Sequence, residues 1–233
     1  MDRQIIILST KDLRAASQQT AAQKGIRLDI KPFIRIEYVA APELITGYER
    51  ITAIFTSVHA VKAYASVPAT ARPEIIAVYC IEGTTEREVK RLMPDVPVLA
   101  SRPYAAELVR DMVQQYSSSL APLLFFCGDQ RMPTIPEGLR QAGIDFEERV
   151  VYHTIACPER TDADYDGILF FSPSAVYSFF SLNTLPEHTV AFAIGNTTAG
   201  ALQPYTDHIV IAAKPDEEVL VDCVLEYCKN IKK

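Results

Sequence analysis

The chain has 233 residues, enough for one large domain or two of ordinary size. A hydrophobic fraction of 48% and a charged fraction of 22% are typical of a folded globular protein and exclude a disordered chain. The formal net charge of −6 argues against general affinity for nucleic acid or anionic membranes.

Targeting and membrane signals are weak in this sequence. The first ten residues, MDRQIIILST, contain only a short apolar run, whereas a signal peptide needs a longer one followed by a small-residue cleavage site. No stretch approaches the roughly 18 apolar residues of a membrane span. We therefore expect a cytoplasmic protein.

The cysteines and histidines give no sign of a disulfide framework or a metal site. The cysteines are odd in number and form no CxxC pair, so we expect buried free thiols in a reducing compartment. The histidines show no metal-ligand spacing. These residues are Cys80, Cys127, Cys157, Cys223, Cys228, His59, His153, His188 and His208.

Short apolar runs recur along the chain and predict buried strands. Several are apolar almost throughout, as expected for strands covered on both faces. The runs are 4–8, 51–55, 75–80, 96–100, 123–127, 167–171, 190–194 and 208–212. Segments between them, such as those around Leu108 and Val224, place apolar residues at helical spacing. The alternation predicts an α/β fold of parallel sheets covered by helices.

Two longer β-like segments break this rhythm. Ile26–Val39 and Ile144–Ile155 alternate in character, and each follows a helical segment that ends in glycine, the usual C-terminal stop. They are too long and too polar for the interior of a sheet. We interpret them as the places where the chain crosses between two lobes.

The sequence also contains an internal repeat. The string IFTSVHAVKAY at 54–64 is similar to LFFSPSAVYSF at 169–179, and Ser57 thereby matches Ser172. Gly25 before Ile26 matches Gly143 before Ile144, and GTTEREV at 83–89 is similar to NTTAGAL at 196–202. Three blocks in the same order predict a duplicated unit, divided near Ser118.

The turns that follow the predicted strands are the candidate binding positions, because open parallel sheets bind ligands at the carboxyl ends of their strands. Nearly all of these turns are rich in hydroxyl groups or glycine. They are 9–11, 56–59, 82–85, 128–131, 172–174 and 195–198. Serine and threonine there can simply cap helices. Alternatively, the remaining N–H groups and the helix dipoles receive an anionic substrate.

Charged residues of both signs lie near these turns, and they have opposite effects on the binding of an anion. Glu82, Glu86 and Glu88 surround Thr85 and would repel a carboxylate. Four basic residues near other turns could offset this repulsion, or they could be ordinary surface charges. They are Lys11, Arg14, Lys62 and Arg131.

Tyr152, in the string VVYHT, is the candidate catalytic residue. On a crossing strand its phenol could donate a proton to a leaving hydroxyl, although a half-buried strand tyrosine is the structural alternative. His153 points to the opposite face by strand alternation. No familiar hydrolase, P-loop or dinucleotide motif is present, and Ser57 and Ser172 have no recognisable base that would make them nucleophiles.

Taken together, several strings resemble the uroporphyrinogen-III synthase family. They are IFTSVHAVKAY, LLFFCGDQRMPTIPEGLRQAGI, VVYHT, LFFSPSAV and AIGNTTAGAL, in the family's order from about residue 50 onward. The resemblance implies two similar three-layer α/β lobes with parallel sheets, joined by a two-stranded β linker. One lobe would hold 1–36 and 156–233 and the other 40–150, with linker strands at about 30–40 and 148–156.

The resemblance also implies a reaction and a set of site residues. Hydroxymethylbilane, a linear tetrapyrrole polycarboxylate, would lose water and cyclise with inversion of ring D, with no metal or organic cofactor and without nucleic acid, membrane or a second copy of the chain. Tyr152 resembles the tyrosine that assists departure of the hydroxyl. The substrate-binding positions implied by the match are Thr10, Ser57, Thr85, Gly128, Arg131, Ser172, Ser174, Thr197 and Thr198.

A second hypothesis stays open at this point. The chain could be a two-lobed module that binds a tetrapyrrole or another small polyanion without chemistry, since a fold does not fix a function. The acidic turn at 82–88 favours this alternative. The same turn also departs from the family pattern, which usually has glycine earlier in it.

Overall fold

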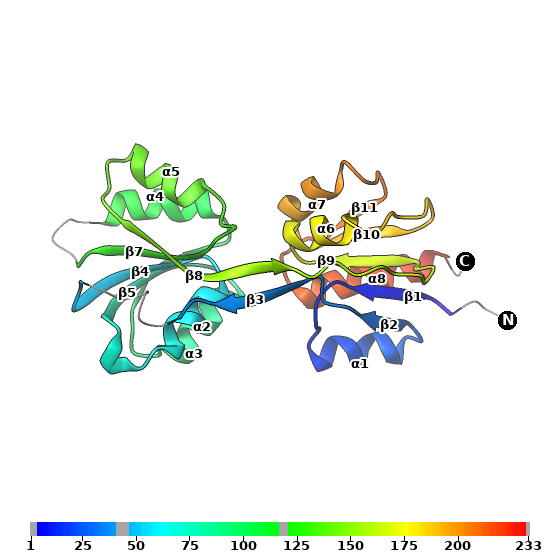
Figure 1. The fold of residues 1–233 in the computed structure, drawn as a ribbon, viewed down its shortest axis with the longest axis horizontal. Helices are drawn as coiled ribbons and strands as arrows, with labels where there is room; N and C mark the ends of the chain where they lie inside the picture. The colour runs from blue at the N-terminus through cyan, green and yellow to red at the C-terminus, as the bar shows by residue number, and fades with distance from the viewer. Residues whose placement is uncertain (1–3, 41–46, 117–120, 232–233) are drawn as a thin grey trace. The chain divides into compact units, whose positions relative to one another are not determined.

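The computed structural model describes residues 4–40, 47–116 and 121–231 (Figure 1). The chain divides into two compact units: unit 1 comprises residues 1–35 and 155–233, and unit 2 comprises residues 36–154. The sequence-based division near Ser118 lies outside the described residues.

Unit 1 contains a five-stranded sheet in the order β11-β10-β9-β1-β2, with every pairing parallel. Helices α1 and α8 cover one face, and α6 and α7 cover the other (Figure 1). Its elements are β1 (Ile6–Ser9), α1 (Ala15–Gln23), β2 (Arg27–Ile30), β9 (Gly167–Phe170), α6 (Pro173–Phe180), β10 (Val190–Ala193), α7 (Asn196–Leu202), β11 (Ile209–Ile211) and α8 (Glu217–Ile231).

Unit 2 contains a six-stranded sheet in the order β3-β8-β7-β4-β5-β6. The pairings from β8 to β6 are parallel, with α2 and α3 on one face and α4 and α5 on the other (Figure 1). Its elements are β3 (Ile34–Tyr38), β4 (Arg50–Phe55), α2 (Val58–Ser66), the 3-10 helix η2 (Ala69–Ala71), β5 (Glu74–Ile81), α3 (Thr84–Leu92), β6 (Val98–Arg102), α4 (Ala105–Gln115), β7 (Leu123–Gly128), α5 (Thr134–Gln141) and β8 (Glu147–Ala156). The predicted α/β class with parallel, helix-covered sheets is therefore confirmed.

The internal repeat does not coincide with the two units. Sheet order β2-β1-β9-β10-β11 in unit 1 matches β8-β7-β4-β5-β6 in unit 2. In each unit, the strand–helix–strand piece comes from the start of one repeat, and three further strands of the matched order come from the end of the other. Gly25 and Gly143, both in the left-handed region with φ of 71° and 69°, end the equivalent helices α1 and α5.

One prediction about the crossing segments was wrong. Ile26–Val39 is not a single long strand, because β2 pairs with β1 as an edge strand of unit 1, and β3 starts again at Ile34. Pro32 between them has no N–H to donate to a strand ladder, and Phe33 is completely buried among the α6-side core residues. The chain passes between the two units within β3 and within β8.

A buried carboxylate ties the start of α1 to the start of α8 in unit 1. Glu217, only 8% exposed, accepts hydrogen bonds from the Arg14 backbone N–H at 2.8 Å and the Ser17 hydroxyl at 2.9 Å. It also pairs with the Lys11 ammonium at 2.8 Å. Burial alone would raise the pKa of Glu217, but the bonds from Lys11, Arg14 and Ser17 outweigh it and lower that pKa.

Removing this carboxylate should destabilise the protein. We expect Glu217→Ala to cost about 3 kcal/mol in the free energy of unfolding, because it leaves buried donors and a cation without a partner. Urea unfolding measures the loss. Glu218→Ala is the matched control: Glu218 is 63% exposed and also contacts Arg14, at 3.3 Å, so the cost should stay within about 0.5 kcal/mol. Equal losses for the two variants would contradict this role.

The lowered pKa gives this contribution a pH dependence. A carboxylate whose folded-state pKa lies below its unfolded value stabilises fully above the unfolded pKa, near 4.5. The stabilisation is lost as the pH falls below that value through the folded pKa. The stability gap between wild type and Glu217→Ala should therefore shrink on acidification below about pH 4.5.

Candidate active site

The strand ends of unit 2 bring together three of the residues predicted from the sequence, Ser57, Gly128 and Tyr152. The first follows β4, the second ends β7, and the third lies on β8. Strands β4, β7 and β8 are consecutive neighbours in the sheet, so their residues meet at one edge.

Ser57 caps helix α2. Its backbone is extended, with φ of −142° and ψ of 139°, and its Oγ accepts a hydrogen bond from the His59 N–H at 3.1 Å. The cap satisfies one of the N–H groups that a helix leaves open at its first turn. The sequence analysis left helix capping and substrate binding as alternatives for this serine, and the capping role is present.

Tyr152 lies directly against Gly128. The two residues are partners in the β7–β8 ladder, and the Asp129 N–H donates to the Tyr152 carbonyl at 3.2 Å. A Cβ at position 128 would stand only 2.4 Å from the Tyr152 ring. Glycine is therefore needed here because the ring occupies the space of any larger side chain.

The phenol of Tyr152 is half-buried, and the Ser57 side chain is among the groups that act on it. Burial raises the pKa of the Tyr152 phenol, the Ser57 side chain lowers it, and the negative charge of Asp129 adds to the raising. The net shift is upward, so Tyr152 keeps its proton throughout the neutral range.

Two further aromatic residues, which the sequence analysis missed, complete this group. The His59 ring lies 5.6 Å from the Tyr152 ring at an interplanar angle of 55°, and 6.5 Å from the Tyr38 ring. The Tyr38 hydroxyl is 3.4 Å from His59 Nδ1. His59 was visible as the second residue after the capping serine, whereas Tyr38 is brought near only by the pairing of β3 with β8.

His153 takes no part in the Tyr152 group. Its Nδ1 lies 3.2 Å from Asp129 Oδ2, and the other oxygen of that carboxylate accepts the Thr154 N–H at 3.0 Å. Asp129 therefore fixes the end of β8 beside Tyr152. Cys127, next to Gly128, is no nucleophile, because burial raises the pKa of its thiol to about 11.

The basic residues near the turns all have acidic partners. Lys11 and Arg14 pair with Glu217, Lys62 lies 4.0 Å from Glu88, and Arg131 pairs with Glu148. Their charges are largely neutralised within the protein. Backbone N–H groups at helix starts are therefore the better candidates for receiving substrate carboxylates.

The remaining predicted position in unit 2, Thr85, is the second residue of α3. This helix starts after Gly83, whose φ is 91°, and the Thr85 side chain is buried. Its neighbour Glu86 forms a hydrogen bond with Ser101 at 2.9 Å and an ion pair with Lys90. Part of the acidic turn thus has partners within unit 2.

The predicted positions of unit 1 lie at the ends of β1, β9 and β10. Ser172 caps α6 by accepting the Ala175 N–H at 3.2 Å, and Ser174 lies in the first turn of that helix. Thr10 donates its hydroxyl and its N–H to the Leu169 carbonyl, at 2.7 and 3.1 Å. On α7, Thr197 is exposed and Thr198 is buried.

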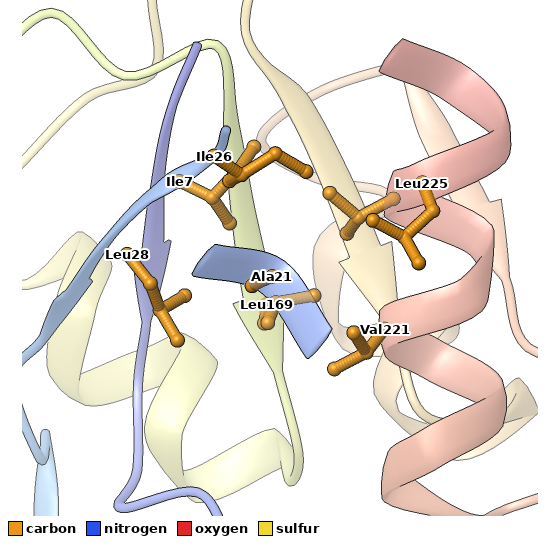
Figure 2. Close-up of a pocket in the computed structure, with 8 residues that line it drawn as sticks. Ile7, Ala21, Ile26, Leu28, Leu169, Val221 and Leu225 are labelled. Atoms are coloured by element: carbon orange, nitrogen blue, oxygen red, sulfur yellow. The ribbon is translucent and has the colours of Figure 1, made fainter. Parts of the chain in front are cut away.

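A small cavity in unit 1 does not belong to this site. It is enclosed by apolar side chains of β1, α1, β2, β9 and α8, among them Ile7, Ala21, Leu28 and Val221 (Figure 2). A polar or charged ligand would find no partner there. We interpret it as a packing gap between α1 and α8.

The described residues contain neither a membrane-spanning helix nor a cluster of metal-ligating side chains. Across 4–40, 47–116 and 121–231, no helix is long and apolar enough to cross a membrane. Within the same ranges, no group of three or more histidine, cysteine, aspartate or glutamate side chains could share a metal ion. All five cysteines are free thiols.

These features define a two-unit α/β protein with polar, helix-capped turns at the carboxyl ends of parallel sheets. Residues 15–222 match the model of the family described as uroporphyrinogen-III synthase HemD. The chain therefore belongs to the uroporphyrinogen-III synthase family, the lyases of heme biosynthesis that act on a linear tetrapyrrole.

Solved structures agree with this fold. A uroporphyrinogen-III synthetase from Helicobacter pylori 26695 is 18% identical with a TM-score of 0.65, covering 96% of this chain and 99% of that one. A mutant uroporphyrinogen III synthase from the extremely thermophilic bacterium Thermus thermophilus is 15% identical with a TM-score of 0.61, covering 98% of this chain and 99% of that one. A search of curated proteins returned no match.

The contact between Gly128 and Tyr152 can be tested directly. We expect Gly128→Ala to push the ring away from the sheet into solvent, and so to lower the pKa of the Tyr152 phenol toward its ordinary value. NMR titration with carbon-13-labelled tyrosine measures this pKa, with Tyr152→Phe identifying the resonance. Gly200→Ala is the control, because its added Cβ meets nothing within 4 Å. An unchanged Tyr152 titration in Gly128→Ala would contradict the tight contact.

Proposed function

We propose that Tyr152 is the general acid of the cyclising dehydration of hydroxymethylbilane to uroporphyrinogen III. The observation that carries this proposal is the position of the Tyr152 phenol, which is half-buried at the strand ends with its ring against Gly128. The Ser57 side chain lowers the pKa of the phenol, and so favours the negative charge that develops on its oxygen when the proton leaves.

The surroundings of the phenol support an acid role. Its pKa is raised, so Tyr152 holds its proton until the substrate takes it. Ser57 caps the start of α2, and the positive end of that helix dipole favours a developing phenolate.

The proton balance of the reaction requires a group that gives a proton and takes one back. The carbon–oxygen bond of the hydroxymethyl group breaks, and the oxygen leaves as water with the proton from Tyr152. The resulting azafulvene cation is attacked by the substituted carbon of ring D, giving a spiro intermediate that rearranges with inversion. Loss of a proton from the closing ring carbon then restores the phenol.

Most of the selectivity is a problem of positioning. Closure without enzyme takes place without inversion, so the protein must hold the chain in the conformation that leads to the inverted product. We propose backbone N–H groups at the starts of α2, α3, α6 and α7 as receivers of the substrate carboxylates. Ser57, Thr85, Ser172, Ser174, Thr197 and Thr198 mark these starts, and Gly128 and Arg131 shape the turn after β7.

We further propose that the enzyme acts as a cytoplasmic monomer whose two units are joined by a two-stranded β linker at about 30–40 and 148–156. The hydrogen bonds at the two crossings support this linker: Cys157 N–H donates to the Phe33 carbonyl at 2.8 Å in unit 1, and Val39 N–H donates to the Val151 carbonyl at 3.1 Å in unit 2. Thr10, whose donors both bind Leu169, holds β1 against β9 beneath the predicted binding turns.

Substituting the acid should lower turnover more than binding. We expect Tyr152→Phe to reduce kcat by about 10-fold or more, with a small change in KM, because the ring remains while the donated proton is lost. Steady-state kinetics with freshly prepared hydroxymethylbilane measure both constants. Tyr104→Phe is the matched control, since Tyr104 is 59% exposed in the same unit. Unchanged turnover in Tyr152→Phe would leave positioning as the whole mechanism.

A further inference from the structure

His59 contacts the proposed acid from helix α2. Tyr152 lies on β8 with its ring against Gly128, whereas His59 comes from the first turn of α2. The two rings are 5.6 Å apart at 55°, a tilted arrangement within the range of favourable aromatic contacts. Gly128 and His59 therefore both contact the Tyr152 ring.

We propose that His59 is a positioning residue for the reaction, which holds the Tyr152 phenol in the orientation needed for proton transfer. This inference rests on the proposed role of Tyr152. Gly128 lies at the hydroxyl end of the Tyr152 ring, and contact there alone would still let the ring tilt. His59 removes this freedom by packing on the ring.

The ring of His59, which meets the Tyr152 ring at 5.6 Å, carries this role. The Tyr38 hydroxyl is 3.4 Å from His59 Nδ1, at the long end of hydrogen bonding, so this contact is weak. Tyr38 is 47% exposed, and its ring lies 6.5 Å from the His59 ring. A flat aromatic side chain at position 59 should therefore substitute for histidine.

The capping geometry explains why position 59 can reach Tyr152. Ser57 accepts the backbone N–H of His59, which fixes the first turn of α2 relative to the cap. The same serine is among the groups that act on the Tyr152 phenol. Residue 59 and the phenol therefore lie beside one side chain, and their rings meet at 5.6 Å.

A double-mutant cycle tests this inference. We expect His59→Ala to lower kcat by about 10-fold, since small displacements of a catalytic group have effects of this size or larger. His59→Phe should restore most of the loss. In the Tyr152→Phe background, His59→Ala should have no further effect on kcat, because the group that it positions no longer donates a proton.

The controls separate this role from a general effect on the fold. His188→Ala removes a histidine of unit 1 that pairs with Asp164, and should leave kcat unchanged. Thermal unfolding verifies that each variant is folded. If His59→Ala is not, His59→Gln, which also lacks a ring, takes its place in the cycle.

The possible outcomes are distinct. If Tyr152→Phe lowers kcat but His59→Ala does not, the positioning role is overturned and the acid role stands. If the effects of the two substitutions multiply, His59 acts independently of Tyr152 and the inference is equally overturned. If Tyr152→Phe leaves kcat unchanged, the proposed acid role fails, and the positioning role fails with it.

Discussion

The close approach of Tyr152 to Gly128 is the constraint on which the candidate active site depends. A Cβ at position 128 would stand only 2.4 Å from the Tyr152 ring, so glycine there leaves the phenol its place at the strand ends. Ser57, which follows the neighbouring strand β4, caps α2, and His59 in the first turn of that helix meets the Tyr152 ring. Helix start, glycine and phenol thus form one arrangement.

The arrangement of the repeats gives two equivalent units with unequal chemistry. Each unit combines the start of one repeat with the end of the other, and Ser57 and Ser172 cap equivalent helices. Tyr152 has its place on β8, whereas the equivalent strand β2 ends at Ile30 and is followed by Pro32. Duplication therefore supplied both units with serine-capped helices, and unit 2 also has the phenol of Tyr152 at its strand ends.

The sequence predicted the features that local chemistry determines. Buried apolar runs predicted the parallel strands, and Gly25 and Gly143 marked the ends of α1 and α5. The break at Pro32 was missed because the alternation of apolar residues continues across it. Tyr38 and Glu217 could not be assigned, since their partners are distant in the chain. The ion pair of Lys11 with Glu217, for example, joins opposite ends of the sequence.

The pairing of the basic side chains supports a site that depends on backbone and helix geometry. Because the basic residues near the turns are paired with carboxylates, we proposed helix starts as the receivers of a polycarboxylate, since they can orient a substrate without a strongly positive surface. Such a site suits a reaction whose difficulty is the geometry of closure. The most direct measurement is the isomer composition of the product formed from fresh hydroxymethylbilane. The account predicts the type III isomer, formed faster than spontaneous closure, whereas type I alone at the spontaneous rate would contradict it.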